Sequence, residues 1–184
     1  MMVQHCLEGD REFGVVLIER GREVGGGDER LDAGTVARMV QVAELADGRY
    51  AMITVGIRRI RVTKWLGDDP YPKAEVEDWP DEEGDSLDSE VSVREVAAVT
   101  AKVRRLAALA LELGDPIGDP SQEISQDLVA SSYQLSSLAP LGPADQYRLL
   151  VEPSPGARLA RLLLLLDDTE AVLQFRLGSG TAGE

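Results

Sequence analysis

The chain has 184 residues, of which 43% are hydrophobic and 28% charged, as in an ordinary globular protein of one domain or two small ones. Its formal net charge is −14. This argues against a general nucleic-acid binder, because such a protein needs Lys and Arg to displace counterions from the phosphates. The acidic balance suits solubility and weakly favours cationic or unfolded partners.

Cysteine usage and hydropathy bear on the compartment. Cys6 is the only cysteine, so no internal disulfide can form, and nothing indicates an oxidising compartment. The first ten residues lack both the basic and the apolar region of a signal peptide. The longest apolar run, Leu162 to Leu166, is far shorter than the ~20 residues that a membrane span needs. We therefore expect a cytoplasmic protein without a membrane partner.

The first half of the chain has the pattern of an antiparallel sheet. Residues 13–19 and 35–45 are rich in aliphatic and β-branched residues and predict two strands. The pair Asp47-Gly48 is a strong hairpin signal. Residues 49–66 then predict one long strand or two in series, and residues 73–79 predict a last strand. Together these segments predict an antiparallel, barrel-like β half.

The alternation of aliphatic residues in the long strand changes phase. They occupy odd positions up to Ile57 and even positions from Ile60 onward. One extra residue near Arg58 and Arg59, a β-bulge, would return both groups to the same face of the sheet. We therefore predict a bulge at that point.

From Asp88 onward the hydrophobic period is helical. The expected core-facing stripe of the first helix comprises Val96, Val99, Val103, Leu106, Ala110 and Leu113. Gly114 and Pro116 predict its end. The pattern Asp119-Pro120, an N-cap followed by proline, predicts a second helix that runs to about Ser137.

Two more helix starts and the domain boundaries complete the predicted organisation. Pro143 and the pair Ser154-Pro155 predict the starts of two further helices. We expect a β subdomain over residues 1–80, a charged, solvated linker over 81–90, a helical subdomain over 91–177 and a disordered tail over 178–184.

Three consecutive glycines, Gly25 to Gly27, raise the possibility of a phosphate-binding loop. Such a loop needs a helix after the glycines, and in the Walker case a Lys followed by Ser or Thr. Here the glycines precede another predicted strand, and Asp28, Glu29 and Asp32 would repel a phosphate. We therefore interpret the segment as a mobile hairpin loop and expect no ATP, NAD or other cofactor.

Catalytic and metal-binding patterns are weak. His5 is the only histidine and lies beside Cys6, but adjacent helical residues point about 100° apart, which disfavours a Cys–His dyad. One Cys and one His cannot form a zinc site. The acidic segment 75–85 lacks the ligand spacing of a calcium loop. We expect neither an enzyme nor a metal site.

One basic cluster stands out in this acidic chain. It could bind an anion or an acidic partner, or it could form a strand face that pairs with acidic residues of neighbouring strands. We favour the second interpretation. The cluster comprises Arg58, Arg59, Arg61 and Lys64.

Three aromatic residues surround the turn that ends the β half. They could line a groove for a peptide, or they could be core residues between the two halves. We favour the core interpretation, keep the groove as the alternative, and name the three as candidate partner-binding residues. They are Trp65, Tyr71 and Trp79.

The order of these segments resembles the Lon N-terminal, or Lon substrate-binding, domain family. The matching stretches are CLEGDREFGVVLI, the pair Val24-Gly25, AGTVARMVQVAELADGRY, VGIRRIRV and PYPKAEVE, and in the helical half residues 127–166. The resemblance implies an α+β fold: a PUA-like antiparallel β-barrel subdomain followed by a C-terminal helical bundle. It also implies that the leucine run lies buried in the closing helix.

The resemblance implies protein binding without chemistry. The family's domain recognises protein substrates and also occurs alone, and this chain resembles the stand-alone kind because it lacks ATPase and protease motifs. Family members usually open with a stretch that supplies the first strands, which is absent here. We expect the open edge left at residues 13–19 either to pair with a second copy of the chain or to make the chain less stable than a form extended upstream.

Three functions from different classes follow. The first is a non-catalytic module that binds unfolded or exposed protein segments, as a proteolysis accessory factor or with a protease or chaperone as partner. The alternative is a PUA-like RNA-binding protein that uses the basic cluster, against which the net charge speaks. A hydrolase with an unrecognised site is the weakest hypothesis.

Overall fold

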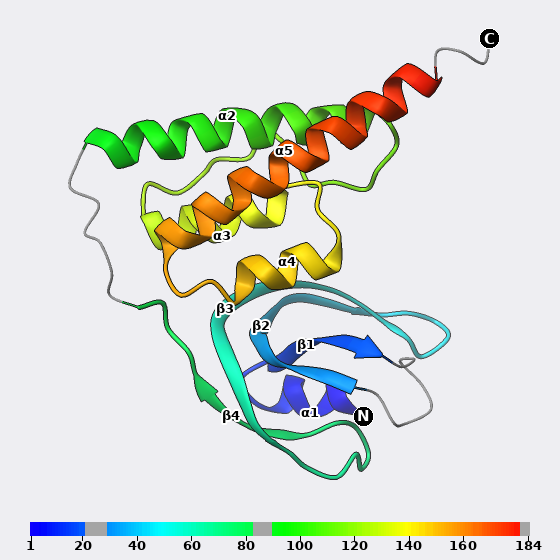
Figure 1. The fold of residues 1–184 in the computed structure, drawn as a ribbon. Helices are drawn as coiled ribbons and strands as arrows, with labels where there is room; N and C mark the ends of the chain where they lie inside the picture. Colours follow the sequence, from blue (N-terminus) through cyan, green and yellow to red (C-terminus); the bar gives the residue numbers. More distant parts are fainter. Residues whose placement is uncertain (21–28, 83–89, 181–184) are drawn as a thin grey trace. The chain divides into compact units, whose positions relative to one another are not determined.

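The computed structural model describes residues 1–20, 29–82 and 90–180 (Figure 1). The chain divides into two compact units, unit 1 with residues 1–80 and unit 2 with residues 81–184. Within these described residues, unit 1 contains the short helix α1 (Met2–Glu8) and four strands, and unit 2 contains four helices. The predicted α+β class is confirmed.

The four strands of unit 1 are β1 (Glu12–Arg20), β2 (Glu29–Glu44), β3 (Tyr50–Trp65) and β4 (Ala74–Asp78). All neighbours pair antiparallel in the order β1-β2-β3-β4. The predicted strands are confirmed, although β2 begins at Glu29 rather than at residue 35. Among the described residues β1 and β4 are the two edges, so the sheet is open at β1, where an open edge was expected.

Tight turns join the strands where the sequence predicts them. Gly48 has a φ of +80°, which favours glycine, and its N–H donates to the Leu45 carbonyl at 2.9 Å. The predicted hairpin between β2 and β3 is therefore confirmed. The glycine-rich loop lies outside the described residues, but β1 and β2 on either side of it pair antiparallel. It joins two strands, as predicted.

The predicted β-bulge is confirmed, one residue earlier than expected. Val36 pairs with Arg58 and Ala37 pairs with Gly56, which leaves Ile57 without an opposite residue. A second register shift between Met39 and Gln41 leaves residue 40 of β2 unpaired in the same way. The long strand β3 is therefore continuous but changes phase at Ile57.

Unit 2 is built around one hydrophobic core from α2 (Glu90–Glu112), α3 (Leu128–Leu138), α4 (Pro143–Leu150) and α5 (Pro155–Gly180). The stripe predicted for α2 is confirmed, because its four central members are at most 1% exposed and its two outer members pack partly buried against them. Gly114, with a φ of +84°, follows the last turn of α2, as predicted.

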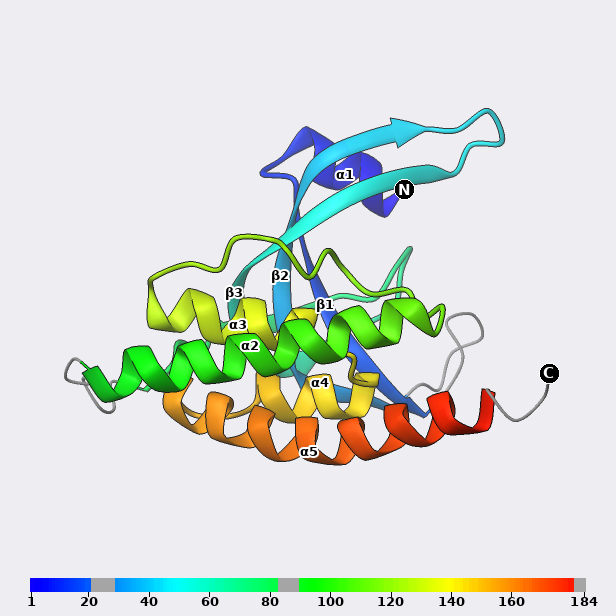
Figure 2. The same ribbon diagram turned by 90° about the horizontal axis from the view of Figure 1, so that it is seen from above.

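The helix predicted from Asp119 to Ser137 is wrong in its first half. The Asp119 carboxylate accepts hydrogen bonds from the backbone N–H and hydroxyl of Ser121, which form a local turn. The helix begins at Leu128, where Asp127 is the N-cap and accepts from the Ala130 N–H at 2.8 Å. Residues 113–127 instead run back beside α2 from its end to the start of α3 (Figures 1 and 2). An extended chain advances up to ~3.3 Å per residue, whereas a helix advances about 1.5 Å per residue. An extended segment therefore reaches from the end of α2 to the start of α3 with fewer residues than a helix would need.

The last two helices begin where predicted. Pro143 opens α4, and the Ser154 hydroxyl caps α5 by accepting from the Ala157 N–H at 3.3 Å. Helix α5 continues to Gly180, so the first three residues of the expected disordered tail are helical, and residues 181–184 lie outside the described part of the chain. None of the helices that the structure describes is long and apolar enough to cross a lipid bilayer.

Burial in the leucine run is more limited than expected. Leu162 and Leu166 are fully buried in the core of unit 2, but Leu164 is 60% exposed and Leu163 is 36% exposed. Residues 162 and 166 are one turn apart, so only one face of α5 points into the core. The opposite face carries apolar side chains at the surface.

A buried ion pair ties the start of unit 2 to α5. Arg158 is 0% exposed and donates to both carboxylate oxygens of Asp81, at 2.6 and 3.0 Å. Its remaining N–H groups reach the Ser132 and Tyr133 hydroxyls and the carbonyls of Leu149 and Glu152. Asp81 was assigned to a solvated linker, and this is wrong because its side chain is only 7% exposed. Residues 83–89 of that linker lie outside the described residues.

Candidate functional site

The three candidate aromatic residues lie at the two ends of the β3–β4 hairpin. Trp65 pairs with Ala74 at one end of β4, and the Trp79 N–H donates to the Arg59 carbonyl at the other, at 2.9 Å. At about 3.3 Å per residue, the six residues from Arg59 to Trp65 span about 20 Å. Trp65 and Trp79 therefore do not line one groove.

Trp65 is the most exposed of the three aromatic side chains. It is 36% exposed, and the neighbouring Leu66 is 39% exposed. The Arg30 guanidinium lies over the Trp65 ring at 4.9 Å and donates to both oxygens of Asp68. These hydrogen bonds lower the pKa of Asp68. Arg30 thus holds the ring in place while part of it faces solvent.

Tyr71 contacts α1. Its hydroxyl lies 2.9 Å from His5 Nδ1, and the two rings pack edge to face. His5 therefore makes its side-chain contact with Tyr71 and not with its sequence neighbour Cys6. Burial and the charge of Asp10 raise the pKa of the Cys6 thiol, which disfavours the thiolate form that a nucleophile needs.

Trp79 packs beneath two guanidinium groups. The Arg59 and Arg61 guanidinium carbons lie 4.2 and 3.9 Å from its ring centroid. Arg59 is 6% exposed and also donates to the carbonyls of Trp79 and Pro80. The Trp79 ring therefore holds in place the segment that follows β4, which is a structural role.

The basic cluster is divided between the two faces of the sheet. Neighbouring residues of a strand point to opposite faces, so Arg58 lies opposite to the face of Arg59 and Arg61. Arg58 binds Glu12 at 2.8 Å and Asp78 at 2.9 Å, and Lys64 lies 3.6 Å from Glu75. Pairing with acidic residues of neighbouring strands is confirmed for Arg58 and Lys64. The cluster does not present one basic surface.

Glu12 is the centre of a charged network on the face of the sheet that carries Arg58. Its carboxylate accepts from Arg38 at 2.6 Å and from Arg58 at 2.8 Å, one on each oxygen. Hydrogen bonds from Arg38 and then from Arg58 lower the pKa of Glu12. The network joins β1, β2 and β3 across the sheet.

A surface that the sequence pattern did not reveal lies on the β2–β3 hairpin. Five aliphatic side chains on this hairpin are between 38% and 58% exposed. We call them the ribbon patch: Val40, Leu45, Ile53, Val55 and Ile57. Ile53 and Val55 share one face of β3, while Val40 and Ile57 are the two residues that the register shifts leave unpaired. The patch thus joins a strand face to both bulges.

Strand length explains why these side chains are exposed. The pairing of β1 with β2 ends at Arg38, and the pairing of β4 with β3 ends at Ile60. Within the described residues, the hairpin beyond these positions is a two-stranded ribbon, which continues past β1 in Figure 2. The bulge brings Val55 to the face of Ile60, as expected, but only Ile60 is buried, at 2% exposure.

Comparisons with known proteins match most of the chain to a single protein family. Residues 1–168 match the family model of the ATP-dependent protease La (LON) substrate-binding domain. A LON peptidase N-terminal domain and RING finger protein of Schizosaccharomyces pombe is 23% identical over 97% of this chain and 42% of its own length. A Lon protease of Anaeromyxobacter dehalogenans is 25% identical over 100% of this chain and 22% of its own length.

Solved structures with a similar fold come from the same kind of protein. The N-terminal domain of a Mycobacterium avium complex Lon protease superimposes with a TM-score of 0.55 at 21% identity, over 90% of this chain and 83% of that one. This likeness supports the fold alone. The chain spans about a fifth to two fifths of the length of the curated relatives that it matches.

Proposed function

The chain belongs to the family of Lon substrate-binding domains, and on that premise we propose that it binds exposed apolar segments of other polypeptides through unit 1. The observation that carries the proposal is the ribbon patch, five half-exposed aliphatic side chains on one hairpin. Contiguous exposed apolar side chains on a soluble protein mark interaction sites. The family's description as a substrate-binding domain gives the partner's class.

The ribbon also offers backbone groups to a partner. Within the described residues, β3 between Tyr50 and Ile57 pairs only with β2, so its outer edge is open. An extended segment can add to such an edge through main-chain hydrogen bonds and place alternate side chains against Ile53 and Val55. Binding of this kind is tolerant of sequence, as recognition of unfolded proteins requires.

The three aromatic residues have unequal places in this proposal. Trp65, exposed beside Leu66, is the aromatic residue best placed to contact a bound segment. Tyr71 supports the same end of the β3–β4 hairpin through His5. Trp79 acts through the fold, by anchoring the end of β4 under Arg59 and Arg61. In this scheme the chain acts by binding, with no chemistry of its own.

A pair of matched double variants tests the proposal. Ile53→Ser with Val55→Ser removes two apolar side chains from the ribbon patch. Leu111→Ser with Val129→Ser removes two from unit 2 that are 41% and 42% exposed. Titration of a labelled, chemically reduced and alkylated protein, followed by fluorescence anisotropy, measures the affinity. We expect about a tenfold loss for the ribbon variant only, since burying an aliphatic side chain contributes up to about 1.5–3 kcal/mol.

Equal affinities of the two variants would contradict the proposal. A labelled RNA serves as the second probe, at low and high salt. If RNA binds with a steep salt dependence and Arg58→Gln with Arg61→Gln abolishes it, the RNA-binding alternative replaces the proposal.

A further inference from the structure

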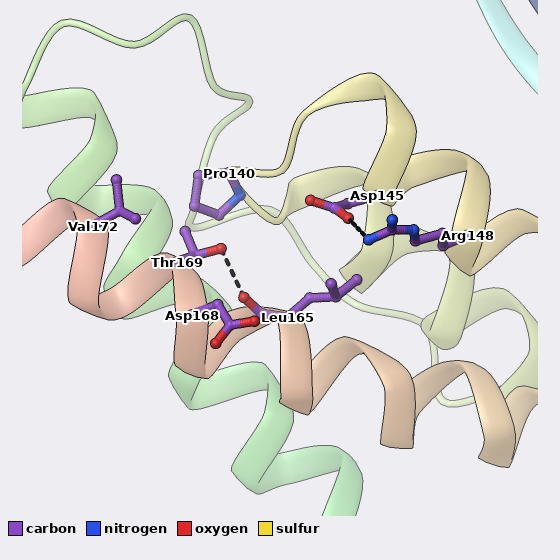
Figure 3. A pocket seen from close by; sticks show the side chains of 7 residues that line it. All are labelled: Pro140, Asp145, Arg148, Leu165, Asp168, Thr169 and Val172. Atoms are coloured by element: carbon purple, nitrogen blue, oxygen red, sulfur yellow. Dashed lines mark hydrogen bonds and ion pairs between the residues drawn. The ribbon is translucent and has the colours of Figure 1, made fainter. Parts of the chain in front are cut away.

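Unit 2 has a hollow of about 300 Å³ between α4, α5 and the segment that joins α3 to α4 (Figure 3). Pockets that take a coenzyme or a drug-sized ligand measure about 300–1,000 Å³. A hollow at the lower limit of this range suits a single long side chain. The lining residues are Pro140, Asp145, Arg148, Leu165, Asp168, Thr169 and Val172.

The charge of this hollow, which we call the α4–α5 hollow, is negative. Arg148 is its one basic residue, and the guanidinium is already paired with Asp145 at 3.0 Å. Asp168 has no such partner: within the described residues its carboxylate makes no hydrogen bond or ion pair, whereas Asp167 binds Lys102 and Glu170 binds Arg105. The free carboxylate is therefore the one at the hollow.

Asp168 also lies within an apolar stripe on the surface of α5. Leu164 is 60% exposed, Val172 is 58% exposed and Phe175 is 76% exposed. These residues lie four positions before, four after and seven after Asp168, spacings that place all of them on one helix face. We call Leu164, Asp168, Val172 and Phe175 the α5 stripe. It combines one unpaired negative charge with three apolar side chains.

The charge of the whole unit has the same sign. Residues 81–184 contain 18 acidic and 8 basic residues, so unit 2 carries a net charge of −10 out of the chain's −14. A partner that docks here must therefore be cationic as well as apolar. Lys and Arg meet both requirements, because their aliphatic stems pack on apolar surface while the charged group reaches a carboxylate.

We propose that the α4–α5 hollow and the α5 stripe bind a partner polypeptide segment in which a Lys or Arg is flanked by large apolar residues. The cationic side chain enters the hollow and pairs with Asp168. Its apolar neighbours pack on Val172 and Phe175. This surface belongs to unit 2 alone and is independent of the ribbon patch.

A charge-isosteric pair of variants of the full chain tests the inference. Asp168→Asn removes the unpaired carboxylate, and Asp167→Asn removes the adjacent one, which is paired with Lys102. The probe is a labelled peptide that repeats Leu-Lys-Phe-Ala, with a second peptide in which Gln replaces Lys. We expect the Lys peptide to bind the wild type, and Asp168→Asn to weaken it about fivefold, the upper end for an ion pair in contact with solvent. Asp167→Asn leaves its affinity unchanged, and Phe175→Ser weakens both peptides.

The outcomes separate this inference from the proposed function. The ribbon variant Ile53→Ser with Val55→Ser binds the Lys peptide as the wild type does if the α5 stripe is the site. If that variant loses the peptide and Asp168→Asn does not, the inference is wrong and the proposed function stands. Equal binding of the Gln and Lys peptides, or equal effects of the two Asn variants, also overturns it. Circular dichroism confirms that each variant is folded.

Discussion

Arg158 shows what a buried charge requires of its surroundings. A guanidinium that is 0% exposed is tolerated only because Asp81, two hydroxyls and two carbonyls satisfy its donors. Removing one partner of a buried pair leaves the other as an uncompensated charge, which costs about 3–5 kcal/mol. We therefore expect Arg158→Ala to lower the free energy of unfolding of unit 2 by about that amount.

Arg161 provides the matched control for this prediction. It lies one turn further along α5, 50% exposed, and pairs with Glu152 at 3.0 Å. Arg161→Ala should lower the free energy of unfolding by less than about 1 kcal/mol, as for other exposed pairs. Urea unfolding followed by far-UV circular dichroism measures both. Similar losses for the two variants would show that burial of the Arg158–Asp81 pair is energetically unimportant.

Glu12 links the stability of unit 1 to pH. Hydrogen bonds from Arg38 and Arg58 lower its pKa in the folded state. The ionised carboxylate therefore stabilises the fold above the ordinary Glu pKa of about 4.3, and this contribution disappears as the pH falls through the lowered folded value. We expect the urea midpoint of unit 1 to fall on acidification below about pH 5, and to fall less in Glu12→Gln.

Glu77→Gln is the control, because Glu77 on β4 makes no ion pair within the described residues. Tryptophan fluorescence reports the unfolding of unit 1. A pH profile of Glu12→Gln that matches those of the wild type and Glu77→Gln would contradict the role assigned to the Glu12 network.

At the scale of the elements, Gly34 sets how closely β1 can approach β2. A Cβ at this position would lie 2.4 Å from the Val15 carbonyl oxygen and 2.7 Å from Val16 Cγ1. Backbone atoms cannot move aside without breaking the strand pairing. We expect Gly34→Ala to lower the free energy of unfolding of unit 1 by about 1–3 kcal/mol, the usual cost of overpacking.

Gly14, in the same pair of strands, is the matched control. A Cβ there would meet Ile60 Cδ1 at 3.6 Å, an ordinary contact. Gly14→Ala should leave stability unchanged or raise it by about 0.5–1 kcal/mol, because alanine loses less backbone entropy in a strand. Urea unfolding followed by tryptophan fluorescence decides. The prediction is wrong if Gly34→Ala is tolerated as well as Gly14→Ala.

The elements also show which features local sequence determines. The strands, the Asp47-Gly48 hairpin, the bulge and the buried stripe of α2 follow from side-chain periodicity and turn chemistry, which act over a few residues. The helix expected at Asp119 fails because its capping pattern is also satisfied by a local turn to Ser121. The span that residues 113–127 must cover then favours an extended chain, and only the assembled helices define that span.

The candidate site was less accessible from sequence for a related reason. The alternation around Ile53 and Val55 is the same whether the strand lies in a sheet or projects as a ribbon. Exposure depends on where β1 and β4 stop pairing, at Arg38 and Ile60, which is a property of the whole sheet. Likewise, the spacing of Trp65 and Trp79 does not reveal that they flank opposite ends of β4.

For the whole molecule, the two units differ in charge and in spectroscopic signature. Unit 1 contains 15 acidic and 11 basic residues, a net charge of −4, against −10 for unit 2. Both tryptophans of the chain, Trp65 and Trp79, belong to unit 1, whereas helices α2 to α5 belong to unit 2. Tryptophan fluorescence and far-UV circular dichroism therefore follow largely different units, so each substitution can be assigned to the unit that it affects.

The outer edge of β1 leads to a prediction about assembly. Among the described residues β1 pairs only with β2, so one row of its N–H and C=O groups is unpaired. The strand contains neither Pro nor Lys, the residues that commonly protect an edge, and Val15 is 49% exposed. Two copies can pair these edges antiparallel about a two-fold axis, because each subunit then contributes the same strand, β1, to the interface.

We therefore expect the chain to form a dimer through β1 at high concentration. Val15→Lys places a positive charge on this edge in both subunits, so it should shift the chain to a monomer without unfolding unit 1. Val129→Lys, at a residue of unit 2 that is 42% exposed, makes the same change of charge away from the edge and should leave the dimer intact. Size-exclusion chromatography with light scattering measures all three proteins over a range of concentrations. A wild-type monomer at the highest concentration would show that the edge is protected in some other way, and a dimer that survives Val15→Lys would place the interface elsewhere.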